Sequence, residues 1–297
     1  MEFLKNLFKV ILLALVEGIT EFLPVSSTGH LILVNDFIKL QPESFANSFN
    51  IIIQLGAILS VMVLYFPRLN PWAAGKQRKN LPPINPHWNT QTKFYVRIFK
   101  RADRPTLRLW ANVLIGCIPG GIFGLLFHDV IKEKLMNSKT VVVTLLLYGI
   151  LIIVMERWNK GRKKVRFQKA QDIPYSSAFL IGCFQCLAMV PGTSRSAATI
   201  IGAMLIGTSR LAAAEFSFFL AIPTMIGTTL LELIKEGASF SGQEWLFILI
   251  GFFLSFLVAG LVIRKFIGYI QHHDFEIFGW YRIVLAILLI IYMLITM

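Results

Sequence analysis

The stretch EGITEFLPVSSTGH, residues 17–30, interrupts an N-terminal segment that is otherwise strongly apolar. Glu17 and Glu21 stand four residues apart in this stretch, so on a helix both carboxylates project from the same face. A carboxylate at membrane depth is costly unless it lines a cavity or binds a cation. The acid pair therefore predicts a functional site inside a membrane domain.

The composition of the whole chain agrees with a membrane domain. Of its 297 residues, 56% are hydrophobic and only 15% are charged, which excludes a soluble globular domain. Apolar stretches of roughly 18 residues or more, the length that crosses a bilayer, recur along the chain. The chain is therefore predicted to be an integral membrane protein built from helices.

The positive charge follows the loops between these apolar stretches. Most of the formal net charge of +13 is concentrated in two loops, at about residues 67–106 and 157–175. Short basic loops between spans are typical of the cytoplasmic side of a membrane. We therefore attribute the charge to membrane topology and expect no nucleic-acid partner.

Eight apolar segments fall into two kinds. Six have the length of full spans: 46–66, 107–127, 139–156, 213–234, 243–263 and 280–297. The other two, 5–34 and 176–206, are longer and contain polar interruptions with proline and glycine. We call residues 24–30 the first turn and residues 191–199 the second turn. Irregular backbone at membrane depth survives only inside protein or beside a wet cavity, so we expect both long segments to be re-entrant helix pairs.

The two halves of the chain resemble each other. An offset of 167 carries Pro24 to Pro191 and Ser27 to Ser194. Each half then has a re-entrant pair followed by three spans, and an odd number of spans inverts the second copy. We predict one all-α membrane domain, with repeat 1 at about 1–156, repeat 2 at about 176–297 and both termini outside. Inverted repeats bring broken helices together at a site near the midplane.

The two turns carry complementary chemistry. The first offers three hydroxyls and an imidazole, and the second offers Arg195 among further hydroxyls. Helix N-termini favour bound anions, and a planar guanidinium suits phosphate oxygens. Glu17 and Glu21 could hold a divalent cation, with Mg²⁺ or Ca²⁺ expected. This combination suits phosphoryl transfer.

Glu21 and Arg195 have the clearest predicted roles. Glu21 lies closer than Glu17 to the hydroxyls of the first turn, and a lone arginine in an apolar stretch is costly without a function. Three nucleophiles remain open: the Ser27 hydroxyl, the His30 imidazole and a water molecule. His30 could instead act as a general base or protonate the leaving phosphate.

Other polar residues have a functional and a structural interpretation each. The candidates for binding substrate are Ser26 and Thr28 in the first turn and Ser194, Ser196 and Thr199 in the second. Their hydroxyls could equally cap or support helix ends. Gln185, one residue from the position that matches Glu17 in the repeat, either orients a water molecule or packs. Gln54 could reach the same cavity, whereas an ordinary interfacial ion pair is the expected role of Arg210 and Glu215.

The motifs resemble a known family. EGxxEFLPxSSTGH at residues 17–30 and PGxSRSxxT at residues 191–199 are similar to the two signature motifs of the bacterial undecaprenyl-diphosphatase, or bacitracin-resistance, family. EFSF at residues 215–218 and GCFQC at residues 182–186 also look like that family. One departure is the polar stretch at about residues 67–104, which is longer than the family usually carries. It does not touch the motifs.

The resemblance implies an activity and a location. A member would hydrolyse undecaprenyl diphosphate to the monophosphate on the outer face of the bacterial cytoplasmic membrane, with a divalent cation. This reaction recycles the lipid carrier of cell-wall synthesis and confers bacitracin resistance. The implied partners are the prenyl diphosphate substrate and membrane lipids, and a homo-oligomer is compatible with the sequence. The alternative is a secondary transporter or lipid flippase, because these also use inverted repeats with broken helices.

Overall fold

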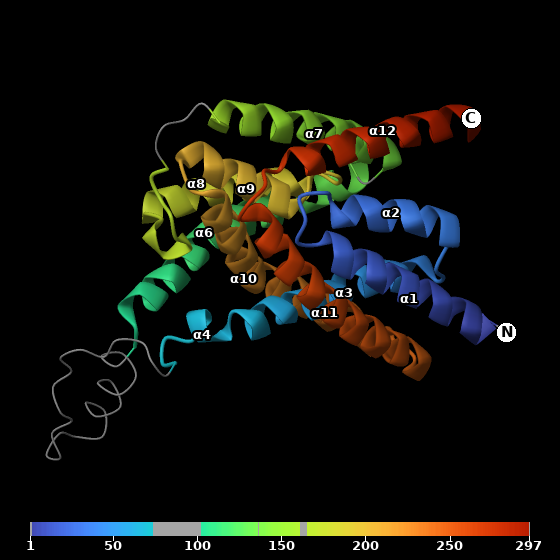
Figure 1. The fold of residues 1–297 in the computed structure, drawn as a ribbon. Helices are drawn as coiled ribbons and strands as arrows, with labels where there is room; N and C mark the ends of the chain where they lie inside the picture. The colour runs from blue at the N-terminus through green and yellow to red at the C-terminus, as the bar shows by residue number, and fades with distance from the viewer. Residues whose placement is uncertain (1, 74–101, 136, 161–164, 297) are drawn as a thin grey trace, which may run out of the picture.

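The computed structural model describes residues 2–73, 102–135, 137–160 and 165–296. Within these residues the regular structure is helical, apart from one isolated bridge between Phe167 and Thr208. The α-helices are α1 (Glu2–Thr20), α2 (Ser27–Ile38), α3 (Glu43–Leu64), α4 (Phe66–Leu69), α6 (Arg104–Leu135), α7 (Ser138–Lys160), α8 (Tyr175–Cys186), α9 (Arg195–Ile206), α10 (Arg210–Glu236), α11 (Gly242–Ile270) and α12 (Glu276–Thr296). Figure 1 shows their arrangement.

Six of these helices are long and apolar enough to cross a membrane. They are α3, α6, α7, α10, α11 and α12, and each contains one of the six predicted spans or most of it. The remaining apolar helices are paired, α1 with α2 and α8 with α9, and each pair is joined through one of the two turns. The prediction of an all-α, multi-pass membrane protein is confirmed.

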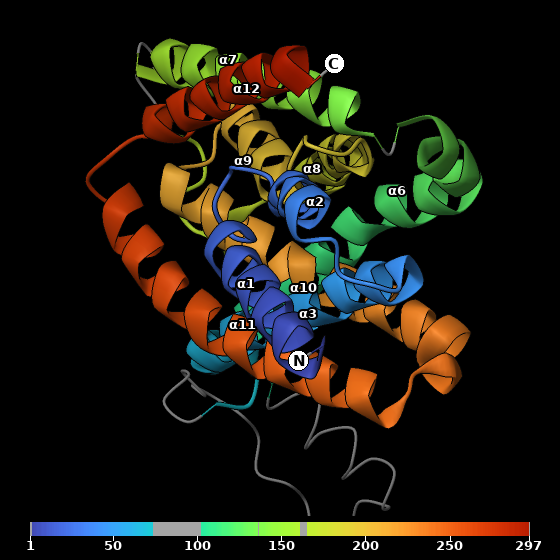
Figure 2. The ribbon, with the colours of Figure 1, turned by 90° about the vertical axis from the view of Figure 1, so that its right-hand side faces the viewer.

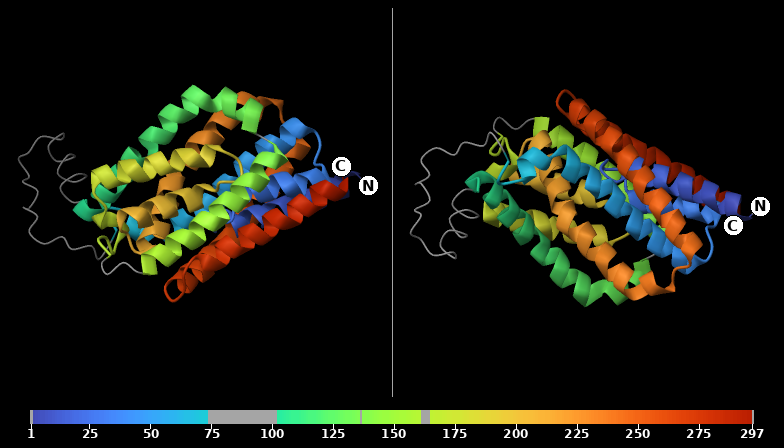
Figure 3. Two further views of the ribbon diagram at one scale, coloured as in Figure 1. Left: turned by 90° about the horizontal axis from the view of Figure 1, so that it is seen from above. Right: turned by 90° about the horizontal axis from the view of Figure 1, so that it is seen from below.

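The two helix pairs enter the molecule from opposite ends. Figure 3 shows both chain termini at one end, which we call the terminal end; the opposite end, where α4 and the start of α8 lie, we call the basic end. The α1–α2 pair starts and finishes at the terminal end, whereas the α8–α9 pair starts and finishes at the basic end. Both turns therefore lie in the interior of the bundle.

Helices of the two halves are interleaved. The first helix of each pair packs against a long helix of the other half, α1 against α11 and α8 against α6, and α7 lies along α12 (Figure 2). The contact between α8 and α6 depends on glycine, because a Cβ at Gly182 would lie 2.2 Å from the Gly116 carbonyl oxygen. Small residues at such crossings let membrane helices approach closely.

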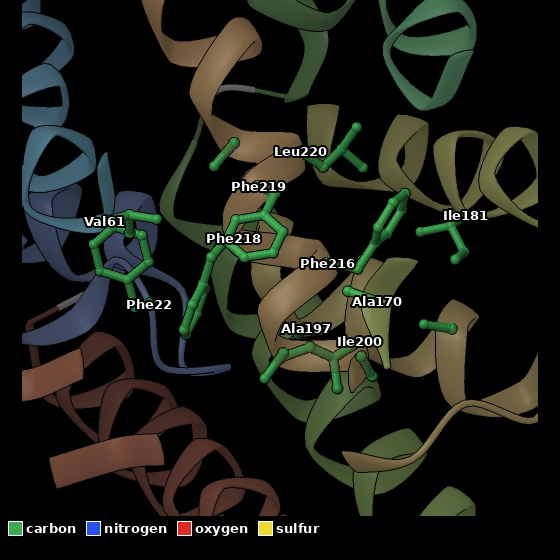
Figure 4. Packing of buried hydrophobic residues seen from close by; sticks show 14 of the residues in the cluster. Phe22, Val61, Ala170, Ile181, Ala197, Ile200, Phe216, Phe218, Phe219 and Leu220 are labelled. Carbon is green, nitrogen blue, oxygen red and sulfur yellow. The ribbon is translucent and has the colours of Figure 1, made fainter. Parts of the chain in front are cut away.

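The core is centred on α10. Phe216, Phe218 and Phe219 of this helix are buried together with Phe22, which lies two residues after the end of α1 (Figure 4). The rings of Phe22 and Phe218 meet edge to face, with centroids 5.1 Å apart and an interplanar angle of 83°, a favourable aromatic geometry. Because Phe22 follows Glu21 directly, this contact anchors the approach to the first turn against α10.

Ion pairs between arginines and buried glutamates stabilise the basic end, but one predicted pair is wrong. Arg210 does not pair with Glu215. It donates to the fully buried Glu156, which also accepts the Phe275 N–H at 3.0 Å, and Glu215 pairs with Arg68. Two residues five positions apart on one helix point in different directions, so Arg210 and Glu215 reach different neighbours.

Candidate functional site

Both turns end in the same capped geometry. Ser26 precedes α2 with φ of 74° and Ser194 precedes α9 with φ of 75°, and each side chain accepts a hydrogen bond of 3.2 Å from the N–H three residues on. Positive φ is rare for serine and stores strain. The two caps are 168 residues apart, one more than the offset taken from the sequence, so Gln185 matches Glu17 directly.

The Ser27 hydroxyl of the first turn and the Arg195 guanidinium of the second turn both contact the carboxylate of Glu21. One carboxylate oxygen of Glu21 accepts a short hydrogen bond from the Ser27 hydroxyl, and the other lies 3.2 Å from Nη2 of Arg195. The second terminal nitrogen of Arg195 donates to the Ser217 carbonyl of α10 at 2.9 Å. Ser27 therefore has a carboxylate positioned to take its proton, the arrangement of an activated nucleophile.

A cavity of about 150 Å³ opens beside these groups. Its lining comes from both turns and from α3 and α10: Glu21, Ser27, Thr28, Gln54, Ala188, Pro191, Gly192, Ser194, Arg195, Thr224, Met225 and Thr228. Thr224 and Thr228 were not predicted from the sequence. Their signal was two hydroxyls one helical turn apart within an apolar span.

Two predicted residues of the second turn lie behind the cavity. Ser196 donates to the Leu23 carbonyl at 2.9 Å and so joins the second helix pair to the first. Thr199 is fully buried and lies 2.7 Å from the Ser217 hydroxyl. Neither lines the cavity, so of the two interpretations that the sequence left open, this arrangement favours a supporting role for both. Ser26 likewise acts as the helix cap.

Glu17 is a fully buried acidic residue whose two carboxylate oxygens both lack hydrogen-bond partners among the described residues. Glu21 and Arg195 are its charged neighbours, and two adjacent carboxyl groups need a shared proton or a cation between them. The carbonyl oxygen of the Gln185 side chain, at the matching position, also lacks a partner within the described part of the chain.

The donor set is compatible with a divalent cation. The described residues contain no group of three or more acidic, histidine or cysteine side chains that could hold a metal ion. Mg²⁺ needs no such group when one or two carboxylates and the phosphate oxygens of a substrate supply the ligands. The unpartnered oxygens of Glu17 and the cavity-facing carboxylate of Glu21 fit that pattern.

His30 points to a different neighbour. Its Nδ1 lies 2.7 Å from the Ser26 carbonyl oxygen and its Nε2 lies 2.7 Å from the Tyr281 hydroxyl. A carbonyl can only accept, so Nδ1 carries the proton and Nε2 accepts from Tyr281. His30 does not line the cavity, and in this arrangement neither ring nitrogen is free to attack phosphorus.

Arg282 is a second buried arginine that the sequence analysis missed. It lies on α12, is fully buried and donates to the carbonyl oxygens of Pro24 at 3.2 Å and Gly192 at 2.6 Å. One guanidinium thus contacts both turns. The rule that singled out Arg195, a lone arginine in an apolar stretch, applies equally to Arg282 and could have found it.

Comparison with known proteins places this site in a wider context. The sequence model of the family described as "Bacitracin resistance protein BacA" matches residues 10–288. The chain is 49% identical over 291 residues to an undecaprenyl-diphosphatase of Lactiplantibacillus plantarum, covering 97% of this chain and 98% of the relative. It is 46% identical to undecaprenyl-diphosphatase 1 of Clostridioides difficile, over 97% of both chains, and 47% identical to an undecaprenyl-diphosphatase of Lachnoclostridium phytofermentans, over the full length of both. The similarity spans both turns and the cavity.

Proposed function

The chain belongs to the bacitracin resistance protein BacA family, and from this membership and the geometry of the site we propose that it is an undecaprenyl-diphosphatase. It hydrolyses undecaprenyl diphosphate to undecaprenyl phosphate and inorganic phosphate, and so recycles the lipid carrier of cell-wall synthesis and confers bacitracin resistance. The relatives named for this activity match nearly the whole chain. The transporter alternative rests on architecture alone.

One observation supports the mechanism. One carboxylate oxygen of Glu21 accepts a hydrogen bond from the Ser27 hydroxyl, and the other accepts one from Arg195. In the first step, the Ser27 oxygen attacks the terminal phosphorus while its proton passes to Glu21. The bond from that phosphorus to the bridging oxygen breaks, and undecaprenyl phosphate leaves. Glu21 gives this proton up to the departing phosphate or to solvent. Glu21 then takes a proton from the water that attacks the phosphoserine and returns it to the Ser27 oxygen as the phosphorus–Ser27 bond breaks, and inorganic phosphate is released. Direct attack by water, activated by Glu21, is the competing route.

Positive groups converge on the place where charge develops. Arg195 lies at the start of α9 and Ser27 at the start of α2, so two helix N-termini and a guanidinium border one cavity. Helix N-termini and arginine stabilise phosphate charge. Such preorganised groups commonly supply the largest part of the rate enhancement.

A divalent cation, Mg²⁺ or Ca²⁺, would be held by Glu17 and Glu21. The support is the unpartnered carboxylate of Glu17 behind the cavity-facing Glu21. When bound, the cation would neutralise part of the charge of the diphosphate. The protein residues keep the proton transfer and the orientation of the phosphate.

The site would face the outer side of the bacterial cytoplasmic membrane. Basic loops mark the cytoplasmic side, and α4, which carries Arg68, lies at the basic end, opposite both termini. The prenyl chain would lie along the exposed apolar faces of the long helices, where side chains such as Phe253 and Leu257 are exposed.

The deciding experiment is release of inorganic phosphate from undecaprenyl diphosphate by the purified protein in detergent. We expect Ser27→Ala to be inactive and Ser60→Ala to be active, because Ser60 is a buried serine that donates only to the Ala57 carbonyl of its own helix. Acid quenching with a labelled terminal phosphate should trap phosphoserine in the wild type. Turnover by Ser27→Ala without a trapped adduct would favour water as the nucleophile. A wild type that moves lipid across vesicles but releases no phosphate would support the transporter.

A further inference from the structure

Arg282 occupies an unusual place for a charged residue. It is the largest of the fully buried side chains, and its guanidinium donates to carbonyl oxygens on three different parts of the chain. These are Pro24 in the first turn, Gly192 and Thr193 in the second turn, and, at longer range, Thr144 and Leu145 of α7.

The charge of Arg282 has no carboxylate partner among the described ion pairs. Carbonyl dipoles and the face of the Tyr148 ring, 5.8 Å from the guanidinium carbon, surround it instead. A buried charge satisfied in this way is costly compared with an apolar residue of similar size. Arginine at this position therefore calls for a function other than stability.

We propose that Arg282 is a positioning residue that locks the two turns to each other and so sets the distance between Glu21 and Arg195. This proposal rests on the proposed phosphatase function. Pro24 lies three residues from both Glu21 and Ser27 in sequence, and the bonded carbonyls of the second turn belong to the two residues before Ser194. The planar guanidinium of arginine, with five donors spread over three nitrogens, is suited to bond to both turns at once.

The contact of Arg282 with the second turn also sets the direction of the Ser194 N–H. In a trans peptide, the carbonyl and the following N–H point to opposite sides. Because the Thr193 carbonyl accepts from Arg282 at 3.1 Å, the N–H of Ser194 points away from Arg282. Ser194 lines the cavity, and on this proposal its N–H would donate to a phosphate oxygen there.

Helix α7 completes the support behind the second turn. The Thr144 hydroxyl donates to the Pro191 carbonyl at 2.7 Å, and Gly192, with φ of 85°, lies so close that a Cβ would come within 2.0 Å of that hydroxyl. Because α7 and α12 pack along each other, they form one wall, and Arg282 extends from this wall to the first turn. Relaxing this contact would let the two turns move apart.

The test compares Arg282→Lys and Arg282→Ala with Arg210→Ala as a matched control. Arg210 also joins distant elements, through the fully buried Glu156, but it contacts neither turn. For Arg282→Lys we expect kcat, corrected for the folded fraction, to fall by about 10²-fold, since misplacement of reacting groups by about 1 Å costs that much. Arg210→Ala should lower the melting temperature and leave the corrected kcat unchanged.

Two further measurements separate positioning from folding. Methylguanidinium should restore turnover of Arg282→Ala saturably and have no effect on Arg210→Ala. Hydrogen exchange, which needs no activity, should show faster exchange in both turns of Arg282→Lys and not in those of Arg210→Ala. Unchanged kcat and unchanged exchange in Arg282→Lys would overturn the proposal. A wild type without phosphatase activity would reject the proposed function, and exchange would still decide whether Arg282 locks the turns.

Discussion

The two turns share a backbone and differ in their side chains. Each has a serine cap with φ near 75° and begins a helix at the same cavity. The first turn contributes a hydroxyl and stands next to the carboxylate of Glu21, and the second turn contributes a guanidinium. At matching positions, the first helix pair carries Glu17 and the second carries Gln185. The similar backbones provide two helix N-termini, and in the proposed mechanism the differing side chains would provide the proton acceptor, the nucleophile and the guanidinium, so neither turn would suffice alone.

The largest expected effect comes from removing either charged group, the carboxylate just before the first turn or the guanidinium in the second turn. Glu21→Ala and Arg195→Ala should each lower kcat by 10³-fold or more, because each removes a preorganised charge from the transition state. The measurement is phosphate release per folded protein. Thr228→Val replaces a cavity-lining residue of α10 with one of the same shape, so its kcat should fall far less. Near-normal turnover in either charge variant would contradict the assigned roles.

The turns should differ in their tolerance of a methyl group. Gly192→Ala places a Cβ 2.0 Å from the Thr144 hydroxyl oxygen and keeps a positive φ, so we expect a loss of about 2–4 kcal/mol in stability together with inactivation. In Gly29→Ala the new Cβ would lie 3.1 Å from its nearest atom, the Ser26 hydroxyl oxygen, and the backbone at this position does not have a positive φ. We therefore expect a smaller loss of stability in this variant. Thermal unfolding and activity of the two variants measure the difference. Equal effects would show that the second turn is not held against α7 as described.

Replacing the acid and the amide at the matching positions, one at a time, tests which of the two residues binds the divalent cation. Glu17→Gln should weaken Mg²⁺ or Ca²⁺ binding by at least 10-fold, the effect typical of losing a metal-orienting group, whereas Gln185→Ala should not. Calorimetric titration of the purified protein with the metal, in the presence of a non-hydrolysable diphosphate, reports affinity independently of turnover. A chelator should also abolish wild-type activity reversibly. Equal metal affinity in Glu17→Gln and wild type would exclude Glu17 as a ligand.

The smallest expected effect concerns the caps. Ser26→Ala and Ser194→Ala each remove one hydrogen bond to a helix N–H, so each should lower stability by about 1 kcal/mol. Only Ser194 lines the cavity, so Ser194→Ala should also raise KM. Melting temperatures should therefore agree between the variants while their kinetics differ. Identical kinetics would place the two caps equally far from the substrate.

Local patterns predicted much of this protein. The six spans, the two interrupted segments, Glu21 and Arg195 were all found from hydropathy and from polar residues in apolar surroundings. These signals are local, because the bilayer selects each span by its own length and composition. The hydroxyls of Ser27 and Thr28 were found in the same way, from their place in the first turn.

Distances between elements far apart in the chain were decided by tertiary packing alone. His30 lies outside the cavity and contacts Tyr281, α10 supplies Thr224 to the lining, and Arg282 reaches both turns from the last helix. The hydrogen bond from Ser27 to Glu21, on which the proposed nucleophile rests, likewise depends on how the chain folds after α1. Composition and periodicity show which polar residues are energetically costly in a membrane. The partner that offsets this cost lies on another helix, so only the folded arrangement identifies it.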